Sequence, residues 1–387
     1  MRNKRLDFLR GMAIVLVLLF HGNIRSHLSN AGWVGVDLFF VLSGFLISGL
    51  LFDEYKRRGS ISFKRFFIRR GFKIYPAYYV FLLVALLARI PFHRVPSPIS
   101  YVGQIFYFQN YGGIVWNHTW SLAVEEHFYI LLPIFFLLLI RYWSGRTNPF
   151  RLVPWAFVVV AITCLAFRVA AVRMVHSGLQ SIPVYRRILS PTHDRMDSLF
   201  FGVLLGYFYH FHPGLLDRIL RPMRNRVALS ILAAACLFPC LIVPVGNAFM
   251  LTLGLTLLYF GFGIVLMICL NTYGVLPAWL AVPVSAIGTA FAFIGVYSYS
   301  IYLWHEEILA GTPVLLWQFF HVKMGPFTEF VVCFSGSIAF GTLMSRLIEY
   351  PVLRLRDRMF PAIQVNPFKP AGPEMTAASI PPSINAV

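Results

Sequence analysis

Arg10 and His21 lie within the first apolar stretch of the chain. They are eleven positions apart, which corresponds to about 16 Å along a helix and to within about 20° of the same helix face. Imidazole is the one side chain whose neutral form is an ordinary base near pH 7, so His21 is a candidate to take a proton from a hydroxyl. The alternative is an arginine that anchors a helix end and a histidine whose hydrogen bonds are satisfied.

Carboxylates also occur where the surrounding sequence is apolar. Asp37 lies in the second apolar stretch, and Glu125 and Glu126 are adjacent in a later one. Any of the three could orient and polarise His21, and the sequence does not select one. Further candidates for contact with a substrate are Arg10, Ser43, His118, Trp120, Arg195, Asp197, Tyr299 and His305.

Several of these candidates also have a purely structural interpretation. Arg195 and Asp197 could form a simple ion pair at a helix start. The aromatic residues around Tyr299 are typical of an interfacial belt. Ser43 and Gly44 could allow two helices to pack closely, a role more typical of the glycine.

Arg69, Arg70 and Lys73 form a basic cluster in the segment 64–76, which we predict to be a cytoplasmic loop. If the segment were helical, Arg65, Arg69 and Lys73 would share a face. Such a cluster could bind a ligand that carries several phosphates. The alternative is a topology signal that contacts anionic lipid.

The elements that carry these residues must lie in a membrane. The chain has 387 residues, 58% hydrophobic and 12% charged, with a mean hydropathy of +0.71. Soluble domains carry about 25% charged residues. In lipid the backbone must satisfy its own hydrogen bonds, and continuous apolar runs favour helices over a barrel. The sequence therefore predicts an all-α polytopic bundle.

The five cysteines lie inside apolar runs, with neither a disulfide pattern nor metal-ligand spacing.

Ten spans and both termini in the cytoplasm are predicted. The predicted spans are 8–26, 33–52, 74–90, 119–140, 152–172, 197–212, 227–244, 248–270, 286–306 and 327–348, with 99–109 as a shorter eleventh candidate. This arrangement puts 24 of the 33 Lys and Arg residues on the cytoplasmic side, which also accounts for the net charge of +18. The polar residues other than Arg10 then lie toward the outer side, which predicts one polar cavity that opens outward. Residues 1–358 form the membrane domain, and 359–387 a disordered cytoplasmic tail.

Several motifs in these segments occur together in a fixed order. They are RLDFLRGMAI (5–14), GVDLFFVLSGFLI (35–47), FFIRRGFKIYP (66–76), WSLAVEEHFY (120–129), RMDSLFFG (195–202), YSYSIYLWH (297–305) and IEYP (348–351). This ordered set resembles the acyltransferase-3 family of integral membrane acyltransferases. The resemblance covers residues 5 to about 356.

The resemblance implies an O-acetyltransferase-type enzyme of a bacterial inner membrane. The donor would be acyl-CoA, often acetyl-CoA, with no permanently bound cofactor or metal. The acceptor would be a hydroxyl of a polysaccharide, lipid-linked glycan, nodulation-type oligosaccharide or secondary metabolite. His21 is the expected catalytic residue. Three positions depart from the family pattern: Lys73 replaces an arginine, His127 replaces a glutamine, and Glu306 follows His305 where a short residue and a proline are expected.

The chemistry that follows is acyl transfer with His21 as general base, or with His21 itself transiently acylated. Arg69, Arg70 and Lys73 would hold the phosphates of CoA at the cytoplasmic end. A transporter or flippase for a glycan or anionic substrate is the alternative from another class, but it predicts repeats or broken helices that we do not find in the sequence. A glycosyltransferase predicts an acidic metal-binding motif, which segment 91–117 lacks.

Overall fold

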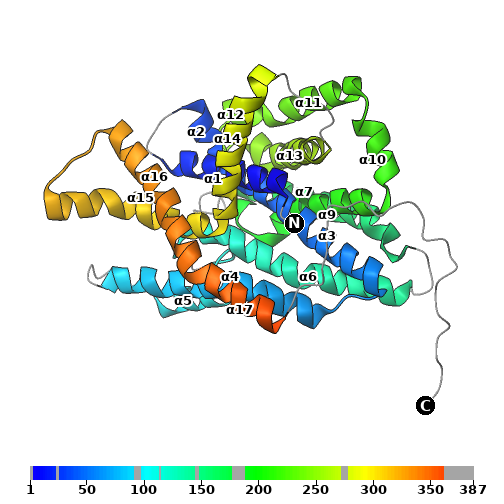
Figure 1. The fold of residues 1–387 in the computed structure, drawn as a ribbon, viewed down its shortest axis with the longest axis horizontal. Helices are drawn as coiled ribbons and strands as arrows, with labels where there is room; N and C mark the ends of the chain where they lie inside the picture. The colour runs from blue at the N-terminus through cyan, green and yellow to red at the C-terminus, as the bar shows by residue number, and fades with distance from the viewer. Residues whose placement is uncertain are drawn as a thin grey trace, which may run out of the picture.

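The computed structural model describes residues 3–22, 26–90, 97–112, 115–143, 148–176, 188–271 and 278–360. Every regular element in these ranges is helical, which confirms the predicted all-α fold (Figure 1). The predicted disordered tail, from residue 361 onward, lies outside the described residues.

Sixteen α-helices make up most of the described chain. They are α1 (Lys4–His21), α2 (His27–Ala31), α3 (Gly35–Arg58), α4 (Phe63–Arg89), α5 (Pro98–Ile105), α6 (Trp120–Tyr142), α7 (Val153–His176), α9 (Thr192–Phe211), α10 (Pro213–Leu220), α11 (Met223–Leu237), α12 (Pro239–Ile242), α13 (Leu255–Leu270), α14 (Ala278–Val296), α15 (Ser298–Phe320), α16 (Pro326–Met344) and α17 (Tyr350–Met359). Short 3₁₀ segments precede α3, α6 and α7, and π-helical turns precede α13 and α17.

The described helices make this a multi-pass membrane protein. Seven are long and apolar enough to cross a membrane, or up to nine if each of two bent pairs counts as one span. The described helices therefore do not confirm the predicted number of ten, which stays a prediction. Helix α1 is not among the seven, and Lys4, Arg5, Asp7 and Arg10 make its first half polar. The cytoplasmic location of both termini stays a prediction.

Two predicted segments have a different shape in the structure. The predicted span 286–306 is not one continuous helix, because α14 and α15 meet there at a bend of 78°, as in a broken span or a re-entrant segment. The apolar run continues through this bend, so composition does not reveal it. The predicted loop 64–76 is wrong, because it is the first half of α4. The Ser62 side chain caps that helix by accepting a hydrogen bond from the Arg65 amide.

Helix α3 is the most buried of the candidate spans and packs along α9 (Figure 1). Gly44 and Gly202 face each other across this contact. A Cβ on Gly44 would collide with the carbonyl oxygen of Leu199, and a Cβ on Gly202 with that of Val41. The predicted packing role of Gly44 is therefore confirmed, and it brings the two helix backbones close together.

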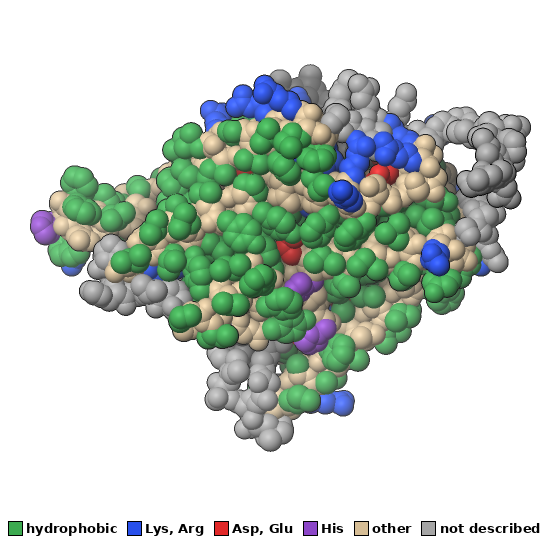
Figure 2. Space-filling view, turned by 90° about the horizontal axis from the view of Figure 1, so that it is seen from below, with side chains coloured by type: hydrophobic (Ala, Val, Ile, Leu, Met, Phe, Trp, Pro, Cys, Tyr) green, Lys and Arg blue, Asp and Glu red, His purple; other side chains and the backbone are tan. Residues whose placement is uncertain are grey.

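The outer surface is apolar, as a lipid-facing surface must be. On the face shown in Figure 2, hydrophobic side chains cover most of the area, and Lys and Arg side chains lie mainly along one rim. This distribution is typical of a membrane belt with a basic boundary.

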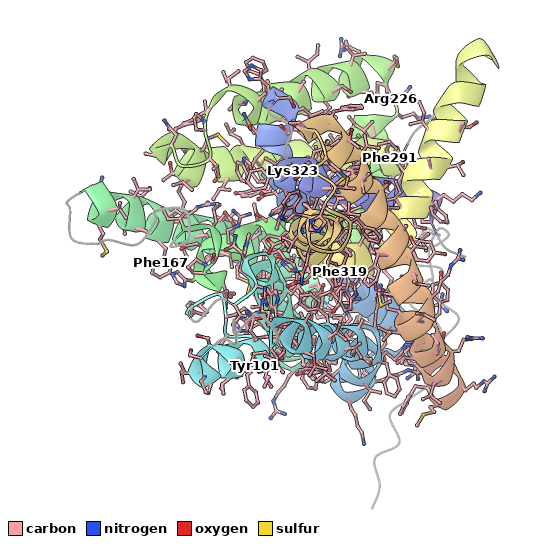
Figure 3. The ribbon with its side chains drawn as sticks, turned by 90° about the vertical axis from the view of Figure 1, so that its left-hand side faces the viewer. Tyr101, Phe167, Arg226, Phe291, Phe319 and Lys323 are labelled. Carbon is pink, nitrogen blue, oxygen red and sulfur yellow. The ribbon has the colours of Figure 1, made fainter. Side chains whose placement is uncertain are left out.

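Helix α15 runs into the middle of the bundle. Figure 3 looks nearly along its axis, with Phe319 close to the centre, Tyr101 of α5 on one side and Arg226 of α11 on the other. Helix α15 also contacts α1, α4 and α16. Its buried residues lie in its first two turns, from Ser298 to His305. This helix therefore carries polar side chains to the centre of the fold.

Candidate active site

A pocket lies beside the first half of α1, and we call it the cationic pocket. It contains about 890 Å³ of space free of protein atoms, including its open mouth. Its polar lining residues are Arg10, Ser43, Arg70, Lys73, Ser121, Glu125, Glu126, Tyr129, Ser298, Tyr299, Tyr302 and Glu349. They come from α1, α3, α4, α6, α15 and the π-helical turn before α17, so six elements converge there.

The charged groups of the cationic pocket are held by neighbouring side chains. The Tyr129 hydroxyl donates to Glu125 at 2.6 Å, and because its one proton is then used, Ser43 donates to Tyr129 at 2.5 Å. The Arg70 guanidinium lies 4.4 Å from the centre of the Tyr129 ring. Tyr75 donates to Glu126 at 3.1 Å. These contacts fix the carboxylates and the arginine before any ligand enters.

Three histidines surround one carboxylate at the other end of α1. We call His21, His118, His305 and Glu306 the histidine cluster. The Nε2 atom of His21 lies 3.4 Å from one Glu306 oxygen, and the Nδ1 atom of His118 lies 3.0 Å from the other. The ring of His305 is 4.9 Å from that of His21 and 5.0 Å from that of His118, centroid to centroid. The cluster thus joins α1, α15 and the segment before α6.

A backbone carbonyl fixes each imidazole ring from behind. The Nδ1 atom of His21 is 2.9 Å from the Val17 oxygen, and that of His305 is 2.7 Å from the Tyr302 oxygen. The Nε2 atom of His118 is 3.0 Å from the Leu303 oxygen. Because a carbonyl oxygen only accepts, each of these nitrogens carries the proton. The second nitrogen of each ring, on the side of Glu306, is the one that can act as a base or a ligand.

A second pocket opens at the histidine cluster, and we call it the histidine pocket. It is lined by His21, Gly22, Glu306, Leu309, Ala310, Glu329, Phe330 and Cys333, and contains about 790 Å³ including open space. Helices α1 and α15 line both pockets. Between them lies Tyr302, whose hydroxyl is 2.7 Å from both the Ser121 hydroxyl and the His118 carbonyl oxygen.

The structure corrects the prediction of one outward-opening polar cavity. Glu125 and Glu126 line the cationic pocket together with Arg10, whereas His118 and His305 lie with His21. The physical reason is length: Glu125 is seven residues beyond His118, about 10 Å if that segment is fully helical. The 3₁₀ turn that carries His118 and the start of α6 therefore contribute to the histidine cluster and to the cationic pocket respectively.

The carboxylate beside His21 is Glu306, and none of the three predicted ones. Glu125 and Glu126 line the other pocket. Asp37 is fully buried and bound by Arg195 at 2.6 Å, so its charge is already compensated. Glu306 follows His305 directly, and a carboxylate at that position was the signal in the sequence that could have identified it.

The ion pair between Arg195 and Asp197, considered as the structural alternative, is replaced by pairs with other helices. Arg195 binds Asp37 of α3, and Asp197 binds Arg168 of α7 at 2.7 Å. All four side chains are buried. Arg195 also lies 5.7 Å from the Trp120 ring. These residues connect α3, α7 and α9, and none of them lines the cationic or the histidine pocket.

Two residues of the α4 basic cluster line the cationic pocket, and one does not. Arg70 and Lys73 line it. Arg69 instead donates to Asp357 of α17 at 3.2 Å and to the Phe360 carbonyl oxygen. Outside both pockets, His127 is 2.7 Å from the Thr192 hydroxyl, so it keeps a hydrogen-bonding role.

The structure also reveals groupings that sequence spacing could not. His21, His305 and Glu306 each offer a ligand atom, and these atoms lie within 4.8 Å of one another, close enough to hold a metal ion. Tyr129, Tyr302 and Glu349 line the cationic pocket, although each reads as ordinary helix sequence. The five cysteines are free thiols, as predicted.

A model of the acyltransferase-3 family, described as an acyltransferase domain, matches residues 3–346. The chain belongs to this acyltransferase family. The matched residues include the whole histidine cluster and every residue that lines the two pockets except Glu349. The resemblance seen in the sequence motifs is therefore confirmed.

Curated relatives include proteins of Listeria monocytogenes and Staphylococcus aureus. The peptidoglycan O-acetyltransferase OatA of Listeria monocytogenes is 27% identical over 372 residues, which is 90% of this chain and 55% of that protein. The O-acetyltransferase OatA of Staphylococcus aureus is 25% identical over 377 residues, or 92% and 58%. The chain spans about half the length of the curated relatives it matches. No solved structure matches the chain.

Proposed function

We propose that this protein is a membrane O-acetyltransferase that moves an acetyl group from acetyl-CoA to a hydroxyl of a carbohydrate. Membership of the acyltransferase-3 family supports the reaction class. The names of the relatives, which include a peptidoglycan O-acetyltransferase, support a glycan acceptor. We further propose that the protein lies in the cytoplasmic membrane with the N-terminal end of α1 inside, where CoA is made.

The cationic pocket is the proposed donor site. CoA carries a pyrophosphate and a 3′-phosphate, and Arg10, Arg70 and Lys73 supply cations from two helices. Glu125 and Glu126 hold the Tyr129 and Tyr75 side chains in place at the edge of this site. From Arg10, α1 leads to His21 over about 16 Å, a distance that an extended pantetheine arm can cover.

The histidine pocket is the proposed acceptor site. The Nε2 atom of His21 takes the proton of the acceptor hydroxyl, and the oxygen forms a bond to the thioester carbonyl carbon. The tetrahedral intermediate then breaks its C–S bond. The leaving CoA thiolate receives the proton from His21, so the imidazole is neutral again. The Glu306 carboxylate, 3.4 Å away, stabilises the imidazolium in between.

The thioester must pass Tyr302 to reach His21. The hydroxyl of Tyr302 bonds to Ser121 and to the His118 carbonyl, so it lies on the boundary between donor and acceptor. A covalent acetyl-histidine at His21 remains the alternative route, since the same lone pair can attack the thioester.

The observation that carries the proposal is that α1 and α15 each line both a cationic pocket and a histidine pocket. The test uses membrane vesicles and [¹⁴C]acetyl-CoA, with label in the glycan fraction as the readout. Wild-type vesicles should label glycan, and His21→Ala vesicles should not. His210→Gln is the matched control, because His210 pairs with Asp53 elsewhere in the fold. Labelling by His21→Ala at the wild-type rate would refute the role of His21. No covalent label with wild type would favour a transporter.

A further inference from the structure

We propose that the histidine cluster is also a binding site for a divalent transition-metal ion such as Zn²⁺. The ligands would be Nε2 of His21, Nε2 of His305 and a carboxylate oxygen of Glu306. No spacing in the sequence indicates this site, because the ligands come from the last residue of α1 and from the middle of α15.

The distances in the cluster suit an ion of this size. The three ligand atoms lie within 4.8 Å of one another. Zinc binds nitrogen and oxygen at about 2.0–2.2 Å, so atoms that share a tetrahedral ion lie about 3.3–3.5 Å apart. The 3.4 Å between His21 Nε2 and Glu306 already has this value. The other ligand atoms, which lie up to 4.8 Å apart, would draw closer together when an ion binds.

The lone pairs in the cluster need a cation. His21 and His305 each use Nδ1 to donate to a carbonyl, so their Nε2 atoms carry lone pairs. The Nε2 atom of His305 is buried and has no hydrogen-bond partner among the described residues, and the side chain is 0% exposed. A buried acceptor without a donor is costly, and the lone pairs of two imidazoles beside a carboxylate repel one another. A metal ion placed between them satisfies all three.

The surroundings of the three ligands are those of a metal site. Histidine ligands almost always donate their second ring nitrogen to a carbonyl or carboxylate, which fixes the tautomer and the ring orientation. Val17 and Tyr302 provide those carbonyls here. Ligating carboxylates are in turn hydrogen-bonded, and His118, when both its ring nitrogens are protonated, can donate from Nδ1 to the second oxygen of Glu306, 3.0 Å away. Three protein ligands and an open fourth position, facing the histidine pocket, match a zinc site that can exchange its fourth ligand.

The ligand types also select the class of ion. Imidazole nitrogen binds Zn²⁺, Cu²⁺, Ni²⁺ and Fe²⁺ well, whereas Mg²⁺ and Ca²⁺ prefer oxygen ligands alone. Two imidazoles and one carboxylate therefore favour a transition metal. The net charge of the ligand set, one negative carboxylate, partly neutralises a divalent ion in this low-polarity position.

Metal binding has a consequence for the proposed acetyl transfer, and this part of the inference rests on the proposed function. The ion would occupy the same Nε2 lone pair of His21 that receives the proton of the acceptor. A molecule with zinc in the cluster therefore cannot use His21 as a base. Zinc should inhibit transfer, and a chelator should restore it.

The test measures metal binding directly, apart from activity. Full-length protein with a Strep-tag, so that no histidine tag interferes, is purified in detergent and titrated with Zn²⁺ by calorimetry. Co²⁺ serves as the spectroscopic probe, since its visible absorption reports tetrahedral coordination. Wild type should bind one ion. Glu306→Gln and His305→Gln should weaken binding more than 100-fold, and His118→Gln, which removes only the outer contact, about 10- to 100-fold.

Matched controls separate the site from adventitious binding. Glu307→Gln removes the neighbouring carboxylate, which binds Arg89 and Trp116, and should leave zinc affinity unchanged. His210→Gln removes a histidine outside the cluster and should behave likewise. Gel filtration confirms that each variant is folded. Wild type without bound metal, or equal affinity in Glu306→Gln and Glu307→Gln, would overturn the proposal.

Activity in the same samples distinguishes the two proposals. Zinc binding at the cluster together with loss of transfer supports both. Zinc binding with unchanged or faster transfer keeps the metal site but refutes His21 as the base. Absence of zinc binding, with transfer still abolished by His21→Ala, refutes the metal site alone.

Discussion

The two pockets, which lie one after the other along α1 and the first half of α15, hold their polar side chains in different ways. In the cationic pocket, side chains hold one another: Tyr129 binds Glu125, Ser43 binds Tyr129, and Arg70 lies over the Tyr129 ring. In the histidine cluster, backbone carbonyls hold the rings, and the reactive atoms face one shared carboxylate. The first arrangement is a network of compensated charges. The second leaves lone pairs directed into a common space.

This difference suggests that, in the proposed reaction, the cationic pocket binds the donor and the histidine cluster catalyses the transfer. In the proposed donor site, many charged side chains hold one another and together bind the CoA phosphates. Replacing one of these side chains should weaken donor binding by the free energy of one contact. In the histidine cluster, few side chains are present and each ring is fixed by the backbone. If this cluster carries out the proposed acetyl transfer, replacing one of its side chains should abolish the transfer. Substitutions should therefore reduce turnover at the histidine end and raise the KM for the donor at the cationic end.

The largest effect is expected at the histidine cluster. His21→Ala should lower kcat about 10²- to 10⁴-fold, because a positioned general base contributes about that much. Adding Glu306→Gln should lower kcat no further, because the two side chains act as one unit. Steady-state kinetics of both single variants and the double variant measure this. A double variant whose loss equals the product of the two single losses would separate Glu306 from His21.

A smaller effect on a different parameter is expected at the cationic pocket. Arg70→Gln should raise the KM for acetyl-CoA about 10- to 100-fold, because one charge-assisted phosphate contact contributes about 1.5–3 kcal/mol. The kcat should change little. Arg69→Gln is the control from the adjacent position, because Arg69 binds Asp357 and lies outside the pocket. An equal increase in KM for both variants would show that the α4 basic cluster acts only through overall charge.

The carboxylates of the cationic pocket should matter less again. Glu125→Gln and Glu126→Gln keep an oxygen that can accept from Tyr129 or Tyr75 but lose the negative charge near Arg70. A neutral acceptor holds its tyrosine about 1 kcal/mol less strongly than a carboxylate does, and the looser side chains around Arg70 should raise the KM for acetyl-CoA by at most about 5-fold. Donor titrations with each variant check this. Full wild-type kinetics in both would remove the two glutamates from the donor site.

The last prediction concerns the sides of the membrane and leaves the chemistry untouched. If the two pockets open toward opposite sides, the ends of α3 must lie on opposite sides as well. Alkaline phosphatase fused after Arg25 should be active, and green fluorescent protein fused after Lys56 should fluoresce, since these reporters work outside and inside respectively. The reverse pattern would place the cationic pocket outside, away from cytoplasmic CoA.

The sequence predicts the helical class and most site residues because these depend on local composition. Charges within apolar stretches indicate His21, Arg10, Glu125 and Glu126, and the basic cluster of segment 64–76 indicates Arg70 and Lys73. The structure brings each of these six residues to one of the two pockets. A charged side chain in lipid needs a partner or a cavity, so this signal is strong. The order and spacing of the family motifs give further support to the same residues.

The partners of these residues depend on tertiary packing, which no local pattern contains. Asp37 finds Arg195 across 158 positions, and Glu306 finds His21 after a 78° bend that the apolar sequence hides. Geometry also separates Arg69 from Arg70, because adjacent helix positions point about 100° apart. The residue types could therefore be predicted, but their pairing could not.

The distance along the chain between Asp37 and Arg195 has a consequence for biogenesis. At about 5–20 residues per second, the ribosome delivers Arg195 about 8 to 30 s after Asp37. During that interval α3 must enter the bilayer with an uncompensated acidic group, whose insertion costs at most about 2.5–3.5 kcal/mol. The Leu, Phe, Val and Ile side chains of α3 offset this cost. The ion pair between α3 and α9 can therefore form only after α9 has been synthesised, so the packing of these two helices is a late step in the assembly of the first half of the bundle.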